Sequence, residues 1–213
     1  MKRILVLVLT LVLLTGCVVI QDVDLDTIIN ETMGTKYTNL YNHVGRGYKY
    51  YLPQSLKSKT TDNLNEIIRS KECDYYLYVD LISYHNKVEF DRKENNTYYF
   101  SKIIEKDGKK GIINIIANAD DKFLVRVEFN YAFIEVITDK ENLNQSLANA
   151  IIIVTSMQYQ DNVIEKLLEE GSLSSIEETV NIFDAKEDVN ALVVDDTYQE
   201  EDEATKYDNV WIK

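Results

Sequence analysis

The sequence is poor in the residues on which disulfide-rich and metal-binding domains depend. It has two cysteines, two histidines and one proline among 213 residues. Two cysteines form one disulfide at most, so stability has to come from an apolar core. The sequence also has no Cys-x-x-Cys pair, no His-Glu-x-x-His and no phosphate-binding glycine loop. These absences exclude the common zinc, iron–sulfur and nucleotide signatures, and we expect neither a cofactor nor a metal.

No apolar run in the sequence is long enough to span a membrane. The longest is Ile4–Leu14, whereas a spanning helix needs about 20 residues. Lys2 and Arg3 precede this run, and a basic segment followed by an apolar run of about 7–15 residues is typical of a secretory signal peptide. We therefore predict that residues 1–16 are an export signal and not a membrane span.

Small residues and a cysteine follow the apolar run. Leu14-Thr15-Gly16-Cys17 resembles the lipobox of bacterial lipoproteins. The resemblance implies that Cys17 receives a diacylglyceryl group, that cleavage follows Gly16, and that acyl chains such as palmitate hold the protein on the extracytoplasmic face of the cell membrane. An ordinary signal peptide is the alternative, but Leu14 fits its small-residue rule poorly. We expect residues 17–43 to be the anchor and a solvated spacer.

Negative charge dominates the chain and is concentrated near its end. The formal net charge is −13, and residues 172–213 hold three lysines against 12 aspartates and glutamates. A chain of this charge without a basic stripe repels nucleic acid, which we do not expect as a partner. Residues 172–213 are predicted to be an acidic disordered tail with room for one short helix. Trp211 is either solvated there or a docking motif for an envelope protein, because tryptophan is common among binding hot spots.

Residues 44–171 are predicted to form one α+β domain, a mostly antiparallel sheet with amphipathic helices packed on it. Strand-like runs at Thr97–Ile104 and Ile112–Ala117 flank the segment Asp107–Gly111. That segment favours a hairpin, because glycine supplies the positive φ that a tight turn needs.

The second half of this domain shows a change of pattern and then two helices. Phe123–Ile137 keeps apolar residues first at odd and then at even positions, which predicts a bulge or a break near Asn130–Phe133. Thr138–Glu141 fits a capping box that begins a helix, and a second helix, Asn162–Glu170, ends at Gly171. The first helix has an apolar stripe and a water-facing side: Leu143, Leu147, Ala150, Ile151 and Val154 on the stripe, and Asn142, Gln145 and Asn149 facing water.

Three features of residues 44–160 follow one another in a specific order. A short aromatic strand ends at Leu52-Pro53, the strand-like run Phe123–Ile137 comes later, and a helix then runs through Ile151 to Thr155-Ser156-Met157. This order resembles the PsbP/Mog1/DcrB-like α/β fold of small exported lipoproteins. The resemblance implies the fold and an extracytoplasmic location. It supplies no catalytic residue, because the bacterial members of that family mostly lack an assigned reaction.

Tyrosines gather in the segment Tyr75–Tyr84, which we predict to be a strand. Its alternation assigns Leu77, Val79 and Leu81 to one face and Tyr76, Tyr78, Asp80 and Tyr84 to the other. Two roles are open to the tyrosines Tyr76, Tyr78 and Tyr84. They belong to the core if helices cover them, and they form an aromatic patch for a protein or a cell-wall glycan if they are bare.

The functional expectation is a lipid-anchored, non-catalytic binding or assembly module of the cell envelope. An envelope hydrolase that uses His43 or His85 with nearby carboxylates is one alternative, since catalytic groups can come together from distant parts of a chain. A small-ligand-binding lipoprotein is the other, and it requires a deep pocket between helix and sheet.

Overall fold

The computed structural model describes residues 23–37, 40–62, 64–118 and 120–173. All of them belong to the first of two compact units, Met1–Ile176, and the second unit, Glu177–Lys213, lies outside the described residues. The predictions on the signal peptide, Cys17, Trp211 and residues 174–213 of the acidic tail therefore also lie outside the described residues, whereas Leu173, at the start of the predicted tail, is buried. Within the described ranges, no helix is long and apolar enough to cross a membrane.

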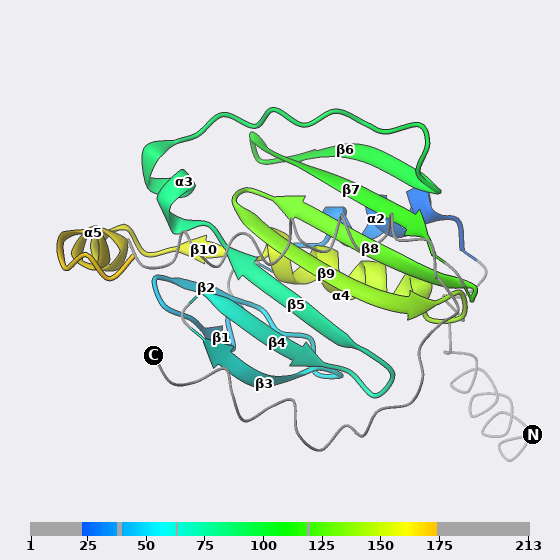
Figure 1. Ribbon diagram of the computed structural model, residues 1–213, viewed down its shortest axis with the longest axis horizontal. Coiled ribbons are helices and arrows are strands. Elements are labelled where there is room, and N and C mark those ends of the chain that lie inside the picture. The colour runs from blue at the N-terminus through cyan, green and yellow to red at the C-terminus, as the bar shows by residue number, and fades with distance from the viewer. Residues whose placement is uncertain (1–22, 38–39, 63, 119, 174–213) are drawn as a thin grey trace, which may run out of the picture. The chain divides into compact units, whose positions relative to one another are not determined.

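The described chain is an α+β domain, as the sequence predicts (Figure 1). The helices are α2 (Leu25–Gly34), α3 (Leu81–Asn86), α4 (Leu143–Thr155) and α5 (Asp161–Glu169). The strands are β1 (His43–Val44), β2 (Tyr48–Tyr50), β3 (Lys57–Asp62), β4 (Asn65–Arg69), β5 (Asp74–Val79), β6 (Phe100–Lys106), β7 (Lys109–Ala117), β8 (Lys122–Phe129), β9 (Ala132–Asp139) and β10 (Gln158–Tyr159).

Seven strands form one antiparallel sheet in the order β3-β4-β5-β9-β8-β7-β6. The predicted hairpin around Gly108 is confirmed: β6 and β7 are joined by the two-residue turn Asp107-Gly108, both with positive φ. A second turn of this kind, Asn130-Tyr131, joins β8 to β9 with φ values of 48° and 66°. The twist of such turns matches that of the strands, which is why both central residues take the left-handed conformation.

This second turn explains the change of pattern in the sequence. Phe129 and Ala132 pair directly across it, so an odd position is followed by an even one on the same face. The predicted break is confirmed, and it is a complete chain reversal between two strands. A tyrosine in the left-handed region is uncommon, so Tyr131 gave no turn signal in the sequence.

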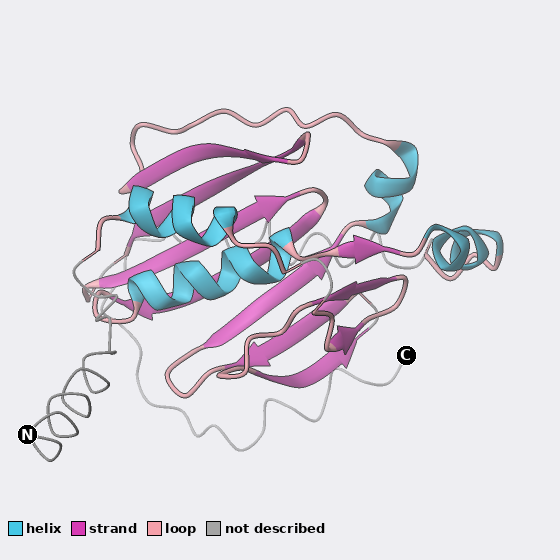
Figure 2. Cartoon of the chain, turned by 180° about the vertical axis from the view of Figure 1, so that it is seen from behind, coloured by secondary structure: helices cyan, strands magenta, loops and turns pink. Residues whose placement is uncertain are grey.

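One face of the seven-stranded sheet is covered by α2 and α4 (Figure 2). Alternate residues of the central strands point to that face and are buried: Leu77, Val79, Val125, Val127, Ile134 and Val136. The predicted apolar stripe of α4 is confirmed, since Leu143, Leu147, Ala150, Ile151 and Val154 are all buried. Burial of apolar side chains from both layers gives the domain its core.

The predicted spacer over residues 17–43 is wrong for its second half. Residues from Leu25 form α2, whose N-cap Asp24 accepts a hydrogen bond from the Thr27 amide. Ile28 and Ile29 are buried, and the Asn144 side chain on α4 donates to the carbonyl oxygen of Val23 at 2.7 Å. The packed domain therefore begins near Val23 and not at residue 44.

The start of α4 also differs from the prediction. Thr138 lies in β9, and its hydroxyl accepts a hydrogen bond from Ser146 instead of capping a helix. The helix begins at Leu143, and Asp139 accepts from the Asn142 amide at 3.0 Å. Asn149 is buried and does not face water, whereas α5 ends as predicted, with Gly171 at a φ of 66°.

Three short strands form a second antiparallel sheet in the order β1-β2-β10. It lies over β4 and β5 on the same side of the large sheet as α4 (Figure 2). The Tyr51 amide donates to the Ser156 hydroxyl at the end of α4, which ties this small sheet to the helix layer.

Candidate functional site

The three predicted tyrosines do not form one surface. Tyr76 and Tyr78 lie on β5, on the face opposite α4, whereas the chain turns at Asp80 and places Tyr84 in α3. Tyr76 is 37% exposed, and Tyr78 is buried with its ring 5.9 Å from that of Phe133. The predicted strand over residues 75–84 is thus too long. Asp80 ends it, because its carboxylate accepts from the Ser83 amide and caps α3.

Tyr84 belongs to a separate aromatic cluster. Its ring stacks on Tyr159 with centroids 3.9 Å apart and meets Tyr131 edge to face. Its hydroxyl donates to Asp161 at 2.8 Å, and burial together with this carboxylate raises the pKa of Tyr84 to about 12. These contacts join α3, α5 and the β8–β9 turn. Tyr84 therefore serves the packing of the domain and is not part of a bare patch with Tyr76.

The most unusual polar group of the described residues is a fully buried carboxylate between the two sheets. Glu66 on β4 is 1% exposed. It accepts hydrogen bonds from the hydroxyls of Tyr48 at 3.0 Å and Tyr50 at 2.7 Å, and it lies 3.0 Å from Nε2 of His43. All three partners come from β1 and β2. A buried charge is stable only when it is paired and hydrogen-bonded, so this cluster fixes the small sheet on the large one.

The electrostatics of this cluster follow from its burial. Loss of water disfavours the charged form of Glu66, but hydrogen bonds from His43, Tyr50 and Tyr48 outweigh this and hold the pKa of Glu66 below its usual value. Burial and the neighbouring carboxylate raise the pKa of both Tyr48 and Tyr50 far above the usual value of tyrosine. The cluster is therefore an anion held by neutral hydroxyl donors.

The two histidines lie in different surroundings. His43 contacts Glu66 and the ring of Tyr50, at a centroid distance of 4.9 Å, while His85 is exposed in the last turn of α3. Among the described residues, neither histidine has a serine or cysteine side chain within hydrogen-bonding distance. The geometry at His43 supports a structural role. Nor do three metal-ligating side chains come together anywhere in the described ranges.

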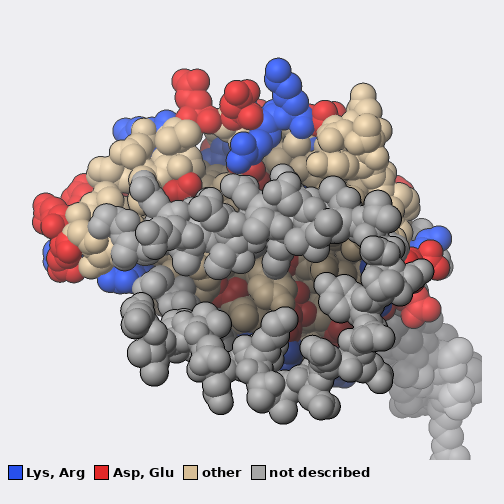
Figure 3. Space-filling model, viewed as in Figure 1, with Lys and Arg blue, Asp and Glu red and all other residues tan. Residues whose placement is uncertain are grey.

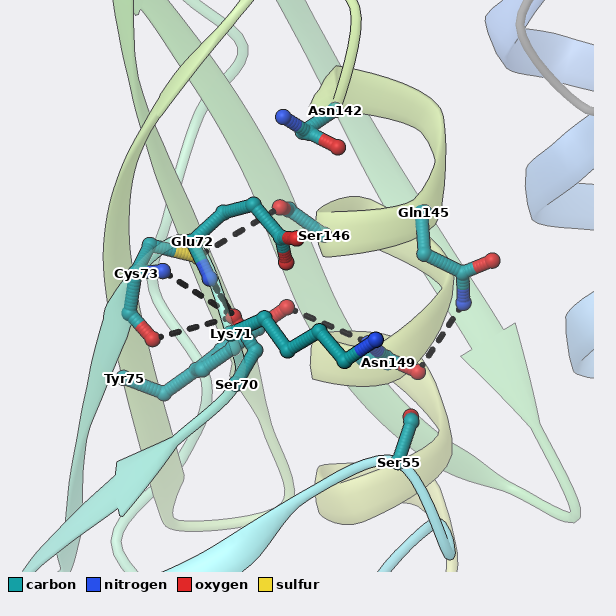
Figure 4. A pocket seen from close by; sticks show the side chains of 10 residues that line it. All are labelled: Ser55, Ser70, Lys71, Glu72, Cys73, Tyr75, Asn142, Gln145, Ser146 and Asn149. Carbon is teal, nitrogen blue, oxygen red and sulfur yellow. Dashed lines mark hydrogen bonds between the residues drawn. The ribbon is translucent and has the colours of Figure 1, made fainter.

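A pocket lies between the β4–β5 hairpin and the first half of α4 (Figure 4). Its volume is about 320 Å³. Three segments line it: Ser55 from the β2–β3 loop, Ser70, Lys71, Glu72, Cys73 and Tyr75 from the hairpin, and Asn142, Gln145, Ser146 and Asn149 from α4. The pocket lies between helix and sheet, where the small-ligand-binding alternative expects one.

Hydrogen bonds hold the polar walls of this pocket in place. The Ser70 hydroxyl accepts from the amides of Glu72 and Cys73, which closes the hairpin turn. On the opposite wall, the Asn149 amide group donates to the Tyr75 hydroxyl at 3.2 Å and accepts from Gln145. Figure 4 shows Ser146 directed from the helix toward Cys73, and Asn149 between Tyr75 and Gln145.

Neither the Glu66 cluster nor the pocket could be identified from the sequence, for the same reason. Glu66 lay in a segment of uncertain structure, and Asn149 was assigned to the water-facing side of its helix. The pocket residues come from segments as far apart as Ser55 and Asn149, so no local spacing connects them. A lone cysteine ahead of an apolar strand is more often a small buried thiol, but Cys73 differs. It is partly exposed at the pocket, where its sulfur lies 3.4 Å from the Ser70 hydroxyl oxygen.

Basic and acidic side chains alternate over the described part of the surface in Figure 3. Arg92 and Glu128 form an ion pair at 2.9 Å, and Arg126 and Glu135 form another at 2.6 Å. These arginines are engaged with carboxylates of the same sheet face. Their charge is therefore partly neutralised locally.

Comparison with known proteins gives little further information. No family model matches the chain, and a search of curated proteins finds no match. Among solved structures, the chain is similar to a GTP-binding regulator from Thermotoga maritima, with 11% sequence identity and a TM-score of 0.25. The match covers 65% of this chain and 93% of that protein. A similarity at this level is no basis for assigning a family or a function.

Proposed function

We propose that the protein is a membrane-anchored, extracytoplasmic lipoprotein whose domain is a non-catalytic binding or assembly module of the cell envelope. The observation that carries the proposal is Leu14-Thr15-Gly16-Cys17, preceded by a basic segment and an apolar run of signal-peptide length. Two acyl chains on Cys17 give stable membrane attachment, whereas one chain alone binds only marginally.

The fold adds a constraint on how far the domain stands from its anchor. Val23, whose carbonyl oxygen already bonds to α4, is only six residue steps after Cys17. An extended chain covers at most about 3.6 Å per residue, so the packed domain begins within about 22 Å of the lipid. The domain is therefore held next to the bilayer, with the start of α4 at the membrane-proximal end.

Metabolic labelling tests the proposal. Cells are grown with an alkyne analogue of palmitate, and the protein is separated into membrane and soluble fractions. We expect labelled protein in the membrane fraction, and no label on Cys17→Ala. Cys73→Ala is the matched control and keeps both label and location. Equal labelling of Cys17→Ala and the unchanged protein, or recovery of the unchanged protein in the cytosol, contradicts the proposal.

A small-ligand-binding lipoprotein is the second candidate, and the pocket beside α4 favours it. The pocket is lined by side chains that both donate and accept hydrogen bonds, and its volume is at the lower end of the roughly 300–1,000 Å³ range of small-ligand sites. Under this candidate, the domain binds one small molecule close to the membrane. A titration of the purified protein with a ligand of suitable chemistry, read at a pocket residue, distinguishes it from a module that binds only other proteins.

A further inference from the structure

We infer that the pocket between the β4–β5 hairpin and α4 binds a small hydroxyl-rich ligand, a saccharide ring that is either free or the headgroup of a glycolipid. The inference names the ligand class for the proposed binding module, and its placement at the membrane rests on that proposal. Four properties of the pocket support this ligand class: the chemistry of its walls, the charge around it, its size and its position.

Three neutral polar side chains that line the pocket carry both donors and acceptors. Ser146 and Asn149 are 2% and 3% exposed, and Tyr75 is 1% exposed, yet all three line the pocket. An asparagine side chain can make four hydrogen bonds. Asn149 makes two to described residues, one to the Tyr75 hydroxyl and one from Gln145, so half of its capacity is left for a ligand. Sugar hydroxyls, which also donate and accept, complement such a surface.

The charge around the pocket disfavours strongly ionic ligands. Lys71 and Glu72 are exposed neighbours in the hairpin turn, so they place opposite charges at the rim. Asp74 follows them and is occupied by the Arg69 guanidinium through two hydrogen bonds of 2.6 Å. A phosphate or a free amine would meet no net opposite charge among these residues. A neutral polyol needs no opposite charge for binding.

The size and position of the pocket restrict the class of ligand further. A pocket of about 320 Å³ accommodates a compact ring better than a long chain or a polymer. Asn142, Gln145 and Ser146 flank Asn144, which bonds to the Val23 carbonyl oxygen where the chain enters from the anchor. The pocket therefore lies at the end of the domain where the described chain begins, at Val23. A saccharide displayed on a lipid at the bilayer surface can reach it there.

Cys73 offers a direct reporter of occupancy, because its thiol lines the pocket and is partly exposed. The full-length lipoprotein is purified in detergent and alkylated with iodoacetamide, and the modification of the Cys73 peptide is followed by mass spectrometry. The probes are glucose, N-acetylglucosamine, and phosphatidylcholine vesicles with or without monoglucosyl diacylglycerol. Ser55→Trp places a large ring at the exposed rim of the pocket, and Gln54→Trp, the next residue in the same turn but outside the pocket, is its matched control.

We expect at least one saccharide probe to slow alkylation of Cys73, by about tenfold at ten times its dissociation constant, because only the unoccupied fraction reacts. Ser55→Trp abolishes the protection and Gln54→Trp retains it. Protection by the sugars alone identifies a free saccharide, and protection only by the glycolipid vesicles identifies a headgroup; either result supports the inference.

Two results overturn it: no probe changes the alkylation rate, or Ser55→Trp is protected as well as the unchanged protein. The Cys73 peptide is read separately from Cys17, so the two proposals fail independently. Protection in a protein without acylation removes the membrane location and leaves the saccharide site. Acylation without protection removes the saccharide site alone.

Discussion

Replacement of Tyr50 by phenylalanine is the sharpest test of the buried Glu66 cluster. The substitution removes one hydroxyl and changes no other contact of a ring that is fully buried. The lost hydrogen bond is short, at 2.7 Å, and its acceptor is ionised. Hydrogen bonds to charged groups contribute about 1.5–3 kcal/mol, so we expect the free energy of unfolding to fall by about 2 kcal/mol at pH 7. For a domain of this size, that corresponds to a melting temperature lower by about 4–8 °C.

The pH dependence of this loss gives an independent check. The folded-state pKa of Glu66 is lowered, so its contribution to stability is fully present above the unfolded pKa of about 4.3 and is lost as the pH falls through the folded pKa. Once Glu66 is protonated, the bond to Tyr50 joins two neutral groups and contributes about 1 kcal/mol. The difference between the unchanged protein and Tyr50→Phe should therefore shrink by about half in acid.

Urea unfolding of the chain from residue 18, followed by circular dichroism at several pH values, measures this difference. Tyr99→Phe is the matched control, because Tyr99 is 55% exposed, and its stability should stay within about 0.5 kcal/mol of the unchanged protein. A loss below 0.5 kcal/mol for Tyr50→Phe at pH 7 would refute the reasoning. So would a loss of the same size at pH 7 and at every lower pH at which the domain stays folded.

Three further predictions concern the packing of the domain, each read by urea unfolding. Ile29→Ala in α2, at 1% exposure, should cost about 2–5 kcal/mol, and a cost near zero would mean that α2 is a spacer after all. Gly111→Ala should prevent stable folding, because the new Cβ would lie 2.1 Å from a carbonyl oxygen of β8. In Gly34→Ala the new Cβ meets nothing within 4 Å, so this variant should be neutral or slightly stabilising. Equal effects of the two substitutions on the free energy of unfolding would contradict this geometry. His43→Ala should lower the free energy of unfolding by about 1–3 kcal/mol, because it removes the contact with the buried carboxylate. His85→Ala should lower it by less than about 0.5 kcal/mol. The reverse order would contradict a structural role for His43.

Local patterns in the sequence were sufficient for much of the sheet and for the helix core. The Asp107-Gly108 turn was identifiable because glycine is the usual residue at positive φ, and the buried stripe of α4 followed from helical periodicity. The change of phase after Phe129 was also visible, although Tyr131 hid the turn that causes it. Thr138 shows the limit of local motifs, since the capping-box pattern occurs at the end of a strand whose threonine bonds to Ser146.

The Glu66 cluster and the pocket were harder to predict from the sequence, because they depend on contacts between distant segments. Glu66 is buried only because Tyr48, Tyr50 and His43 come from another sheet, and each is at least 16 residues away in the sequence. Asn149 is polar and was assigned to water. Its burial follows from the Tyr75 hydroxyl, 74 residues earlier, which accepts a hydrogen bond from its amide group.

The most direct test of the lipoprotein proposal is the mass of the N-terminal peptide of the protein extracted from cell membranes. The account predicts a peptide that begins at Cys17 and carries the mass of a diacylglyceryl group. A peptide that retains residues 1–16, or one that begins at an unmodified residue, would contradict it.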